Sequence, residues 1–198
     1  PVAVWAWNSM LAAVCGDTTI WKPSDITPLT AIAMINVAHE VMRDQDIFTP
    51  ENGDPCDVFG LIIGTVEEIG EPMIADRRLP LISATGSCRM GRRVGEVVGG
   101  RLGSSLLELG GNNAIIIMDD ADLDMVIRGT LFGAVGTAGQ RCTSTRRLLC
   151  HESIADKVTE GLLKSYTQVS IGNPLEGSTL MGQLIDEQAV DTTRSQTE

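Results

Sequence analysis

A cysteine beside basic residues is the first candidate for chemistry in this sequence. Cys142 lies in the stretch GTAGQRCTSTRR, with Arg141 directly before it and Arg146 and Arg147 shortly after it. A thiol attacks as the thiolate, which a positive or N–H-rich setting favours. A cysteine in this position could equally be a small buried hydrophobe, half of a disulfide or a metal ligand. The rest of the sequence has to decide between these four roles.

The cysteine and histidine content argues against two of them. The five cysteines are odd in number and widely spaced, and no CxxC pair occurs. This pattern argues against a disulfide framework and favours a reducing compartment. His39 and His151 form no ligand pair at a zinc spacing, so we expect no metal site. Nucleophile and small buried hydrophobe stay open for Cys142. We expect the other four, which are Cys15, Cys56, Cys88 and Cys150, to be small buried hydrophobes.

A carboxylate at the end of an apolar segment is the second candidate. Glu108 stands in LLELGG, directly before Leu109 and two glycines. A carboxylate among apolar groups holds its proton closer to neutral pH and can serve as a general base. Such a glutamate can also be satisfied by N–H groups of the following loop. The glycines favour the functional interpretation because they allow a close approach of the backbone to another group.

A Gly-Ser pair in TGSCRMG is typical of an anion site. Gly86 closes an expected strand and Ser87 opens an expected helix, so N–H groups at the helix start and the serine hydroxyl could receive a pyrophosphate. The glycine pattern GxGxxG is absent, and a serine N-cap after a glycine turn is common in α/β proteins. Taken alone, this stretch favours an ordinary helix cap.

WKPSD adds a lysine and a carboxylate at the exit of another expected strand. Lys22 and Asp25 suit the hydroxyl groups of an adenosine ribose, and a carboxylate would repel a 2′-phosphate, which favours NAD over NADP. On this stretch alone a surface ion pair between the two residues is the simpler interpretation.

The elements that would position these residues alternate along the chain. Because the strand segments are unbroken apolar runs, we expect a parallel sheet covered on both faces, which is a doubly wound α/β fold. Ligands bind such sheets at the carboxyl ends of the strands, where the candidate residues fall. The expected strands are 18–23, 58–64, 80–86, 105–111, 112–118 and 146–153, and the expected helices are 3–15, 28–44 with Thr27 as N-cap, 66–76, 87–103, 121–139 and 153–169.

The composition of the chain argues against two kinds of binding partner, nucleic acids and membranes. The formal net charge of −11 over 198 residues argues against a nucleic-acid partner. No apolar run approaches the ~20 residues that span a bilayer, and we expect no membrane association. The first residues lack the basic region of a signal peptide, so we expect a cytoplasmic protein. The chain starts at Pro1 rather than Met, and its polar end, DTTRSQTE, is expected to form no terminal element, as in an internal piece of a longer protein.

Five segments taken together resemble a known family. WKPSDITPLTA, ATGSCRMG, LLELGGNNAIII, DDADLD and GTAGQRCTSTRRL, in this order, resemble the aldehyde dehydrogenase superfamily. The variants GNNA and GTAGQRCT resemble its antiquitin-like branch, whose members oxidise α-aminoadipic semialdehyde. The resemblance runs from Pro1 to about Val190 and covers the middle of a family member. It implies part of a Rossmann-like NAD-binding domain over 1–107, the start of the catalytic domain over 108–198, and a homo-oligomeric parent, a dimer or a tetramer.

The resemblance also implies a role for each candidate. Cys142 would attack a small-molecule aldehyde to give a thiohemiacetal, hydride would pass to NAD, and Glu108 would activate water to hydrolyse the resulting thioester. Arg141 would contact the distal carboxylate of the substrate, for which a guanidinium is well shaped. The residues implied in cofactor binding are Lys22, Asp25, Gly86, Ser87 and Leu109.

Some positions depart from the family pattern. Asp25 replaces the more usual glutamate, and Gln183 stands where proline normally follows Gly182. The asparagine that donates to the oxyanion would lie before Pro1, and losing such a donor costs about 10²–10³ in rate. The Glu-x-Phe segment that holds the nicotinamide ribose would lie after the chain. A non-catalytic dinucleotide-binding or structural fragment is therefore the alternative function. An unrelated nucleotide-binding reductase is a weaker one, since it leaves Glu108 and Cys142 together unexplained.

Overall fold

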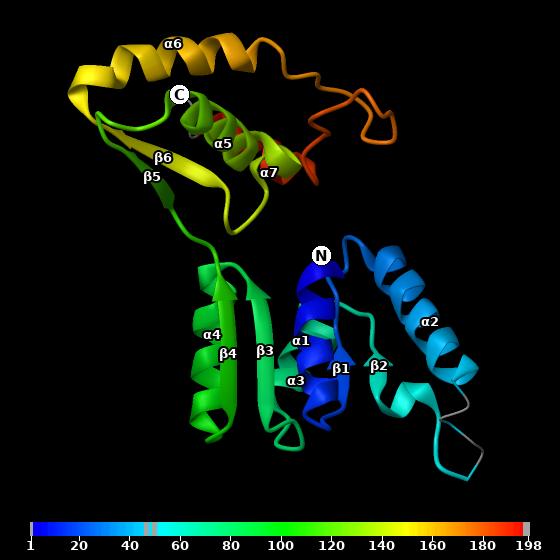
Figure 1. The fold of residues 1–198 in the computed structure, drawn as a ribbon. Helices are drawn as coiled ribbons and strands as arrows, with labels where there is room; N and C mark the ends of the chain where they lie inside the picture. Colours follow the sequence, from blue (N-terminus) through cyan, green and yellow to red (C-terminus); the bar gives the residue numbers. More distant parts are fainter. Residues whose placement is uncertain (1, 46–47, 49–50, 196–198) are drawn as a thin grey trace. The chain divides into compact units, whose positions relative to one another are not determined.

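Three pairs of parallel strands carry the fold (Figure 1). Each of the six expected strands overlaps one observed strand, and the parallel pairing with intervening helices confirms the predicted α/β class. In the described part of the chain the strands are distributed over three two-stranded sheets rather than one continuous sheet. The pairs are β1 (Thr19–Trp21) with β2 (Phe59–Leu61), β3 (Leu81–Gly86) with β4 (Ser104–Leu109), and β5 (Asn113–Ile117) with β6 (Thr145–Cys150).

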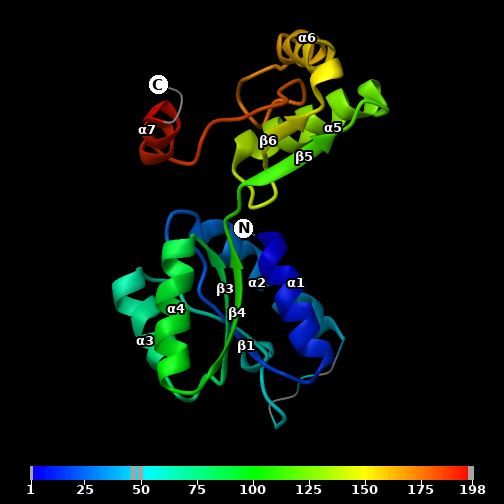
Figure 2. The same cartoon turned by 90° about the vertical axis from the view of Figure 1, so that its left-hand side faces the viewer.

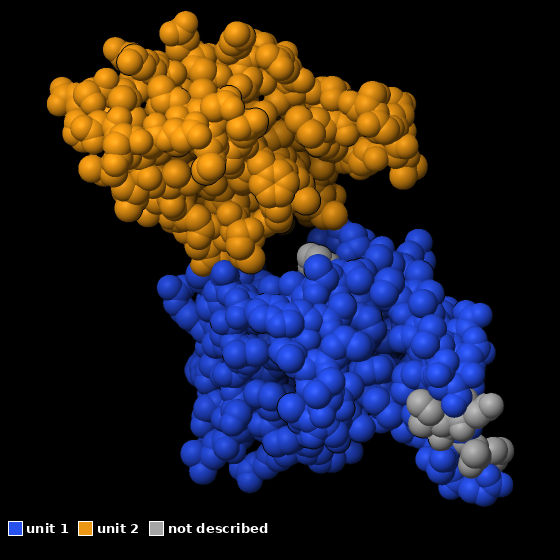
Figure 3. All heavy atoms as spheres, viewed as in Figure 1, with its two compact units in different colours: residues 1–109 blue, residues 110–198 orange. Residues whose placement is uncertain are grey.

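The structure is a computed structural model that describes residues 2–45, 48 and 51–195. It divides into two units, residues 1–109 and residues 110–198, which Figure 3 colours separately. The assignment of residues 1–107 to a cofactor domain and 108–198 to a catalytic domain stays a prediction. Among the described residues, no helix is long and apolar enough to cross a membrane.

The described part of the first unit contains four α-helices: α1 (Val2–Val14), α2 (Pro28–Asp44), α3 (Glu71–Ala75) and α4 (Cys88–Gly100). Gly16 follows α1 with φ of +84°, the left-handed conformation expected for a helix-ending glycine. Thr27 precedes α2 as predicted, but its side chain makes no capping hydrogen bond. Its ψ of 55° departs from the extended backbone that normally aims a cap side chain at the first N–H groups. The predicted position of the N-cap residue was therefore right, but the hydrogen bond expected from a capping side chain is not formed.

Two apolar clusters hold this unit together. Trp5 of α1 stacks on Trp21 of β1 with ring centroids 4.6 Å apart, and it meets the edge of Phe59 of β2 at 6.0 Å. Helix α4 covers β3 and β4 (Figure 2) and buries Val94 and Val98 against them. Helix α4 is thereby held against the strand pair.

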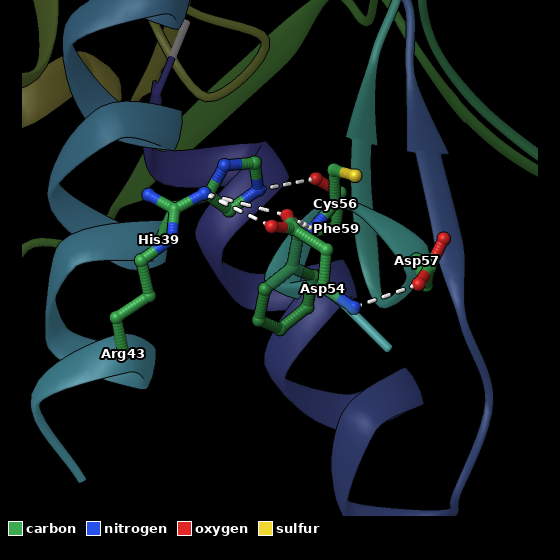
Figure 4. A network of polar contacts seen from close by, with 6 residues as sticks. All are labelled: His39, Arg43, Asp54, Cys56, Asp57 and Phe59. Atoms are coloured by element: carbon green, nitrogen blue, oxygen red, sulfur yellow. Dashed lines mark hydrogen bonds and ion pairs between the residues drawn. The ribbon is translucent and has the colours of Figure 1, made fainter. Parts of the chain in front are cut away.

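A polar network joins α2 to the segment that leads into β2 (Figure 4). His39 Nε2 lies 2.7 Å from the Phe59 carbonyl oxygen, so the tautomer or cation with a hydrogen on Nε2 donates to it. Arg43 pairs with Asp54 at 3.3 Å, and the Asp54 N–H donates to the Asp57 carboxylate at 2.8 Å. His39 is half-buried, as expected from its place on the helix. The network fastens the beginning of β2 to α2.

The second unit contains β5 and β6 together with α5 (Leu123–Val135), α6 (Ala155–Tyr166) and α7 (Glu187–Ser195). Its core lies where Ile117 of β5 meets Ile154 and Val158, all of them less than a tenth exposed. Helix α6 begins two residues later than predicted because residues 152–154 form a separate 3₁₀ turn.

Helix α7 contradicts the prediction that the polar end of the chain forms no terminal element. The Asp186 carboxylate accepts a hydrogen bond from the Ala189 N–H at 2.8 Å, which caps the helix start. Within the helix the Thr192 and Thr193 hydroxyls donate to carbonyls four residues back, at 2.8 Å and 2.9 Å. Local capping and side-chain hydrogen bonds thus support a helix that lacks apolar periodicity.

Candidate active site

Four of the predicted site residues share the carboxyl end of one strand pair. In the parallel register of β3 and β4, Gly86 lies opposite Leu109 and Thr85 lies opposite Glu108. Ser87 follows Gly86 directly and opens α4. Gly86, Ser87, Glu108 and Leu109 therefore meet at one strand end, where parallel sheets bind ligands.

Ser87 caps α4. Its Oγ accepts from the Met90 N–H at 3.1 Å, which leaves the hydroxyl hydrogen to donate to another group. A side chain at Gly86 would come within 2.7 Å of the end of Met90, so glycine keeps the approach to the helix start open. N–H groups, a helix start and a serine hydroxyl together form a setting that suits an anion.

Leu109 and Glu108 end the second strand in different ways. The Leu109 methyl groups lie over Gly91 of α4, so this side chain packs inside the unit. Glu108 is half-buried, and within the described chain no loop N–H or cation bonds its carboxylate. The alternative interpretation, in which loop N–H groups satisfy Glu108, finds no support in the structure.

Lys22 and Asp25 follow β1. The Lys22 ammonium donates to the Pro23 carbonyl at 2.8 Å, and the side chain is half-buried with its Cε next to Gly70. Asp25 is exposed. The ion pairs found among the described residues do not include one between these two, so the simpler alternative of a surface ion pair is not what the structure contains. Their ribose-binding role stays a prediction.

Helix α5 ends earlier than the sequence suggested. The prediction carried the helix to residue 139, but it stops at Val135 because Thr137 and Ala138 adopt left-handed backbone conformations, with φ of 52° and 53°. Gly139 continues the left-handed run at φ of 70°. The chain leaves the helix axis here, four residues before Cys142.

Cys142 lies at the tip of a tight turn in the second unit. The Ser144 N–H donates to the Arg141 carbonyl at 3.1 Å, and the Ser144 hydroxyl accepts from the Arg141 N–H at 3.1 Å. Ser144 is only 1% exposed, so these two hydrogen bonds between the ends of the turn are shielded from water. Cys142 and Thr143 project between them, and both are exposed. The thiol is therefore accessible. Cys15, Cys56 and Cys88 are exposed as well, so the prediction that these three are buried core residues was wrong.

Arg141, next to Cys142, is held against α5. Arg141 Nη2 donates to the Phe132 carbonyl at 3.2 Å, and the guanidinium lies 5.1 Å from the centroid of the Phe132 ring. Gly136 makes room for it, since a side chain there would come within 2.5 Å of Nη2. Its Nε is buried without a hydrogen-bond partner. The guanidinium thus keeps donors that the fold does not use.

The two other basic residues bond loop carbonyls near the turn. Arg147 donates twice to the Asn112 carbonyl, at 3.2 Å and 2.9 Å, and Arg146 reaches the Gly139 carbonyl at 3.5 Å. These hydrogen bonds stabilise the backbone near the turn and do not involve the Cys142 thiol. The suggestion that the arginines act on the Cys142 sulfur directly is supported by no contact among the described residues.

The sequence analysis missed Asn113 and Ser144. Ser144 braces the turn, and the Asn113 side chain donates to the carbonyls of Cys142 and Ser144. The available signal was weak: a polar residue at the first position of an otherwise apolar strand. In the part of the chain that the structure describes, no three metal-ligating side chains gather, and none of the five cysteines forms a disulfide.

Comparison with known proteins identifies the family. The aldehyde dehydrogenase family matches residues 1–198, and the chain belongs to it, as predicted. It is 52% identical over 184 residues to aldehyde dehydrogenase family 7 member B4 of Arabidopsis thaliana, covering 93% of this chain and 35% of that protein. It is 45% identical over 190 residues to the alpha-aminoadipic semialdehyde dehydrogenase of Bos taurus, covering 96% and 34%. The chain thus spans about a third of the length of the curated relatives it matches.

Solved structures agree with this assignment. Betaine aldehyde dehydrogenase from Staphylococcus aureus in complex with NAD⁺ superposes with a TM-score of 0.83 at 32% identity, covering 98% of this chain and 36% of that one. The NAD-dependent aldehyde dehydrogenase from Sinorhizobium meliloti gives 0.82 at 33% identity, covering 92% and 34%. The homo-oligomer and the cytoplasmic location stay predictions.

Proposed function

We propose that the full-length protein carrying this chain oxidises an aldehyde to a carboxylate with NAD, using Cys142 as the nucleophile and Glu108 as the general base. The observation that carries the proposal is the exposed Cys142 at the tip of a doubly braced turn, in a chain of the aldehyde dehydrogenase family. Exposure alone does not set Cys142 apart, since Cys15, Cys56 and Cys88 are exposed too; the braced turn and the family membership support its role as the nucleophile.

The first step takes place at the Cys142 turn. The sulfur attacks the aldehyde carbon, a C–S bond forms, the thiol proton is released and the carbonyl oxygen becomes an oxyanion. Because the Arg141 carbonyl accepts from Ser144 inside the turn, the N–H on the opposite side of that trans peptide, which is the N–H of Cys142, points away from the turn. It can donate to the oxyanion.

The second half-reaction releases the acid. Bound NAD supplies the acceptor for the hydride that leaves the thiohemiacetal carbon, which converts the thiohemiacetal to a thioester. Glu108 takes a proton from water, the water oxygen attacks the thioester carbon and the C–S bond breaks. Cys142 regains its proton and the carboxylate product departs.

The residues at the end of β3 fit a dinucleotide. The start of α4 with Gly86 and Ser87 would hold the pyrophosphate, since Ser87 keeps a hydroxyl hydrogen to donate. Lys22 and Asp25 would bind hydroxyl groups of the adenosine ribose. The Asp25 carboxylate disfavours a 2′-phosphate, and NAD is therefore the cofactor we propose.

For the substrate we propose α-aminoadipic semialdehyde. The name of the relative from Bos taurus motivates this choice, and this substrate carries a carboxylate remote from the aldehyde. Arg141 precedes the nucleophile, and the hydrogen bond from Nη2 to the Phe132 carbonyl does not occupy the other terminal nitrogen of its guanidinium. A guanidinium can bind a carboxylate through two parallel hydrogen bonds.

The test is turnover by the full-length protein, measured as NADH formed with α-aminoadipic semialdehyde. Cys142→Ala should abolish NADH formation, whereas Cys15→Ala, which removes another exposed cysteine, should leave it unchanged. Glu108→Gln should give one rapid equivalent of NADH and then stall, because acylation proceeds and hydrolysis does not. NADH formation that survives in Cys142→Ala would overturn the proposal. NAD binding without any turnover would favour the non-catalytic alternative.

A further inference from the structure

The Asn113 side chain spans the turn that carries Cys142. Its Nδ2 lies 2.5 Å from the Cys142 carbonyl oxygen and 3.0 Å from the Ser144 carbonyl oxygen. Both partners are acceptors, and only the amide NH₂ group can supply two hydrogens to two acceptors. The chemistry therefore fixes the orientation of the amide.

The local backbone is shaped to allow this contact. A side chain at Gly111 would come within 3.0 Å of the Asn113 Oδ1, so glycine leaves room for the amide. The pairing of β5 with β6 is irregular at this point. Asn113 lies opposite Thr145 and Ala114 lies opposite Arg147, so Arg146 of β6 is skipped. The irregularity lies beside the residue of β5 that holds the turn.

Two braces fix the peptide planes on either side of Cys142. The Arg141 carbonyl is held by the Ser144 N–H, and the Cys142 carbonyl is held by Asn113. Because each peptide is planar and trans, fixing these two carbonyls also fixes the direction of the N–H groups of Cys142 and Thr143. It also restricts the backbone from which the sulfur projects.

We propose that Asn113 is a positioning residue for Cys142: its amide holds the peptide that follows the nucleophile, so that the thiol and the Cys142 N–H face the reacting carbonyl together. This inference rests on the proposed role of Cys142 as nucleophile. Asn113 touches neither substrate nor cofactor, and it acts through the two carbonyls.

Asn112 provides a matched control one residue earlier. Its side chain is exposed and makes no hydrogen bond within the described residues, and only its backbone carbonyl is used, by Arg147. Asn112→Ala and Asn113→Ala delete the same group, but only the second removes the donors to the turn. Asn113→Gln keeps the amide on a side chain longer by one methylene.

The experiment compares these three variants in the full-length protein. Two quantities are measured: the kcat and KM for aldehyde oxidation, and the iodoacetamide alkylation rate of Cys142 relative to that of Cys15. Misplacing a reacting group by about 1 Å can cost about 10²-fold in rate, so we expect Asn113→Ala to lower kcat ten- to a hundredfold with little change in KM. The alkylation ratio should fall with kcat. Asn113→Gln should recover part of both losses, and Asn112→Ala should behave as the wild type.

Equal behaviour of Asn113→Ala and Asn112→Ala in kcat and in alkylation would overturn the inference. So would a fall in kcat that Asn113→Gln does not relieve at all. If Asn113→Ala shows no thermal unfolding transition, Asn113→Gln is compared with the wild type instead. A wild-type kcat and a wild-type alkylation ratio in Asn113→Gln support the role of the amide, and complete loss of turnover refutes it. The proposed function fails separately, through turnover that persists in Cys142→Ala.

Discussion

Gly91 is the position where the structure makes its sharpest prediction about stability. This glycine is buried in α4, and a methyl group there would lie 2.5 Å from both Leu109 Cδ atoms and 3.1 Å from Cγ. Replacing a helical glycine by alanine gains about 0.5–1 kcal/mol through backbone entropy. Overpacking a fitted core costs about 1–3 kcal/mol. Taking mid-range values, Gly91→Ala should lower the free energy of unfolding by about 1 kcal/mol.

Gly99 in the same helix is the control. It is exposed, and a methyl group there would meet no atom within 4 Å, so Gly99→Ala should show only the gain of about 0.5–1 kcal/mol. The assay is urea unfolding followed by circular dichroism, which should separate the two variants by about 2 kcal/mol. If Gly91→Ala were as stable as Gly99→Ala, Leu109 would be free to move aside. The contact between Leu109 and Gly91 would then not fix Leu109, and our account of how α4 holds the end of β4 next to Glu108 would be wrong.

Two further predictions concern polar contacts of the first unit. Hydrogen bonds from Arg78 lower the pKa of the Asp76 carboxyl to about 2, so its contribution to stability is present above the ordinary value of 3.8 and is lost as pH falls towards about 2. Between pH 3.8 and about 2, the free energy of unfolding measured in urea should therefore fall less for Asp76→Asn than for the wild type. An equal fall in both proteins would refute this prediction. His39→Ala should cost about 1 kcal/mol, because the hydrogen bond to the Phe59 carbonyl is lost. Urea unfolding should show a smaller loss for Arg43→Ala, because its ion pair with Asp54 is exposed and screened by water; equal losses would contradict this account.

Strands and most helices could be predicted because their signals are local. The run AIII and the run LLEL read as buried strands without knowledge of their partners, and β5 and β4 lie there. Which strands pair is a long-range property, and the division into three two-stranded sheets has no local signature. Helix α7 was missed for a different reason: its support comes from Asp186 and threonine hydroxyls rather than from an apolar face.

In the candidate site too, residues with local roles could be predicted from the sequence and residues with long-range contacts could not. Ser87 could be predicted as a helix cap because a serine after a glycine turn specifies that role locally, and it does cap α4. Asn113 could not be predicted, since its two acceptors are 29 and 31 positions away in the sequence. The stacking of Arg141 on Phe132 likewise depends on where α5 ends, and the sequence-based prediction placed that end four residues too late.

That error has a physical cause that bears on Cys142. Left-handed backbone costs an ordinary residue about 1–2 kcal/mol, and Thr137 and Ala138 adopt it consecutively. Such strain persists only where surrounding contacts over-determine it. The Gln140 N–H and side-chain amide both donate to the Thr137 carbonyl, at 3.0 Å and 3.3 Å, and Gln140 Oε1 accepts from the Ile185 N–H at 2.9 Å. A helix continued through Gly139 would avoid this strain. The contacts of Gln140 therefore maintain a costly departure from the helix, and this departure leads the chain into the turn where Cys142 is exposed.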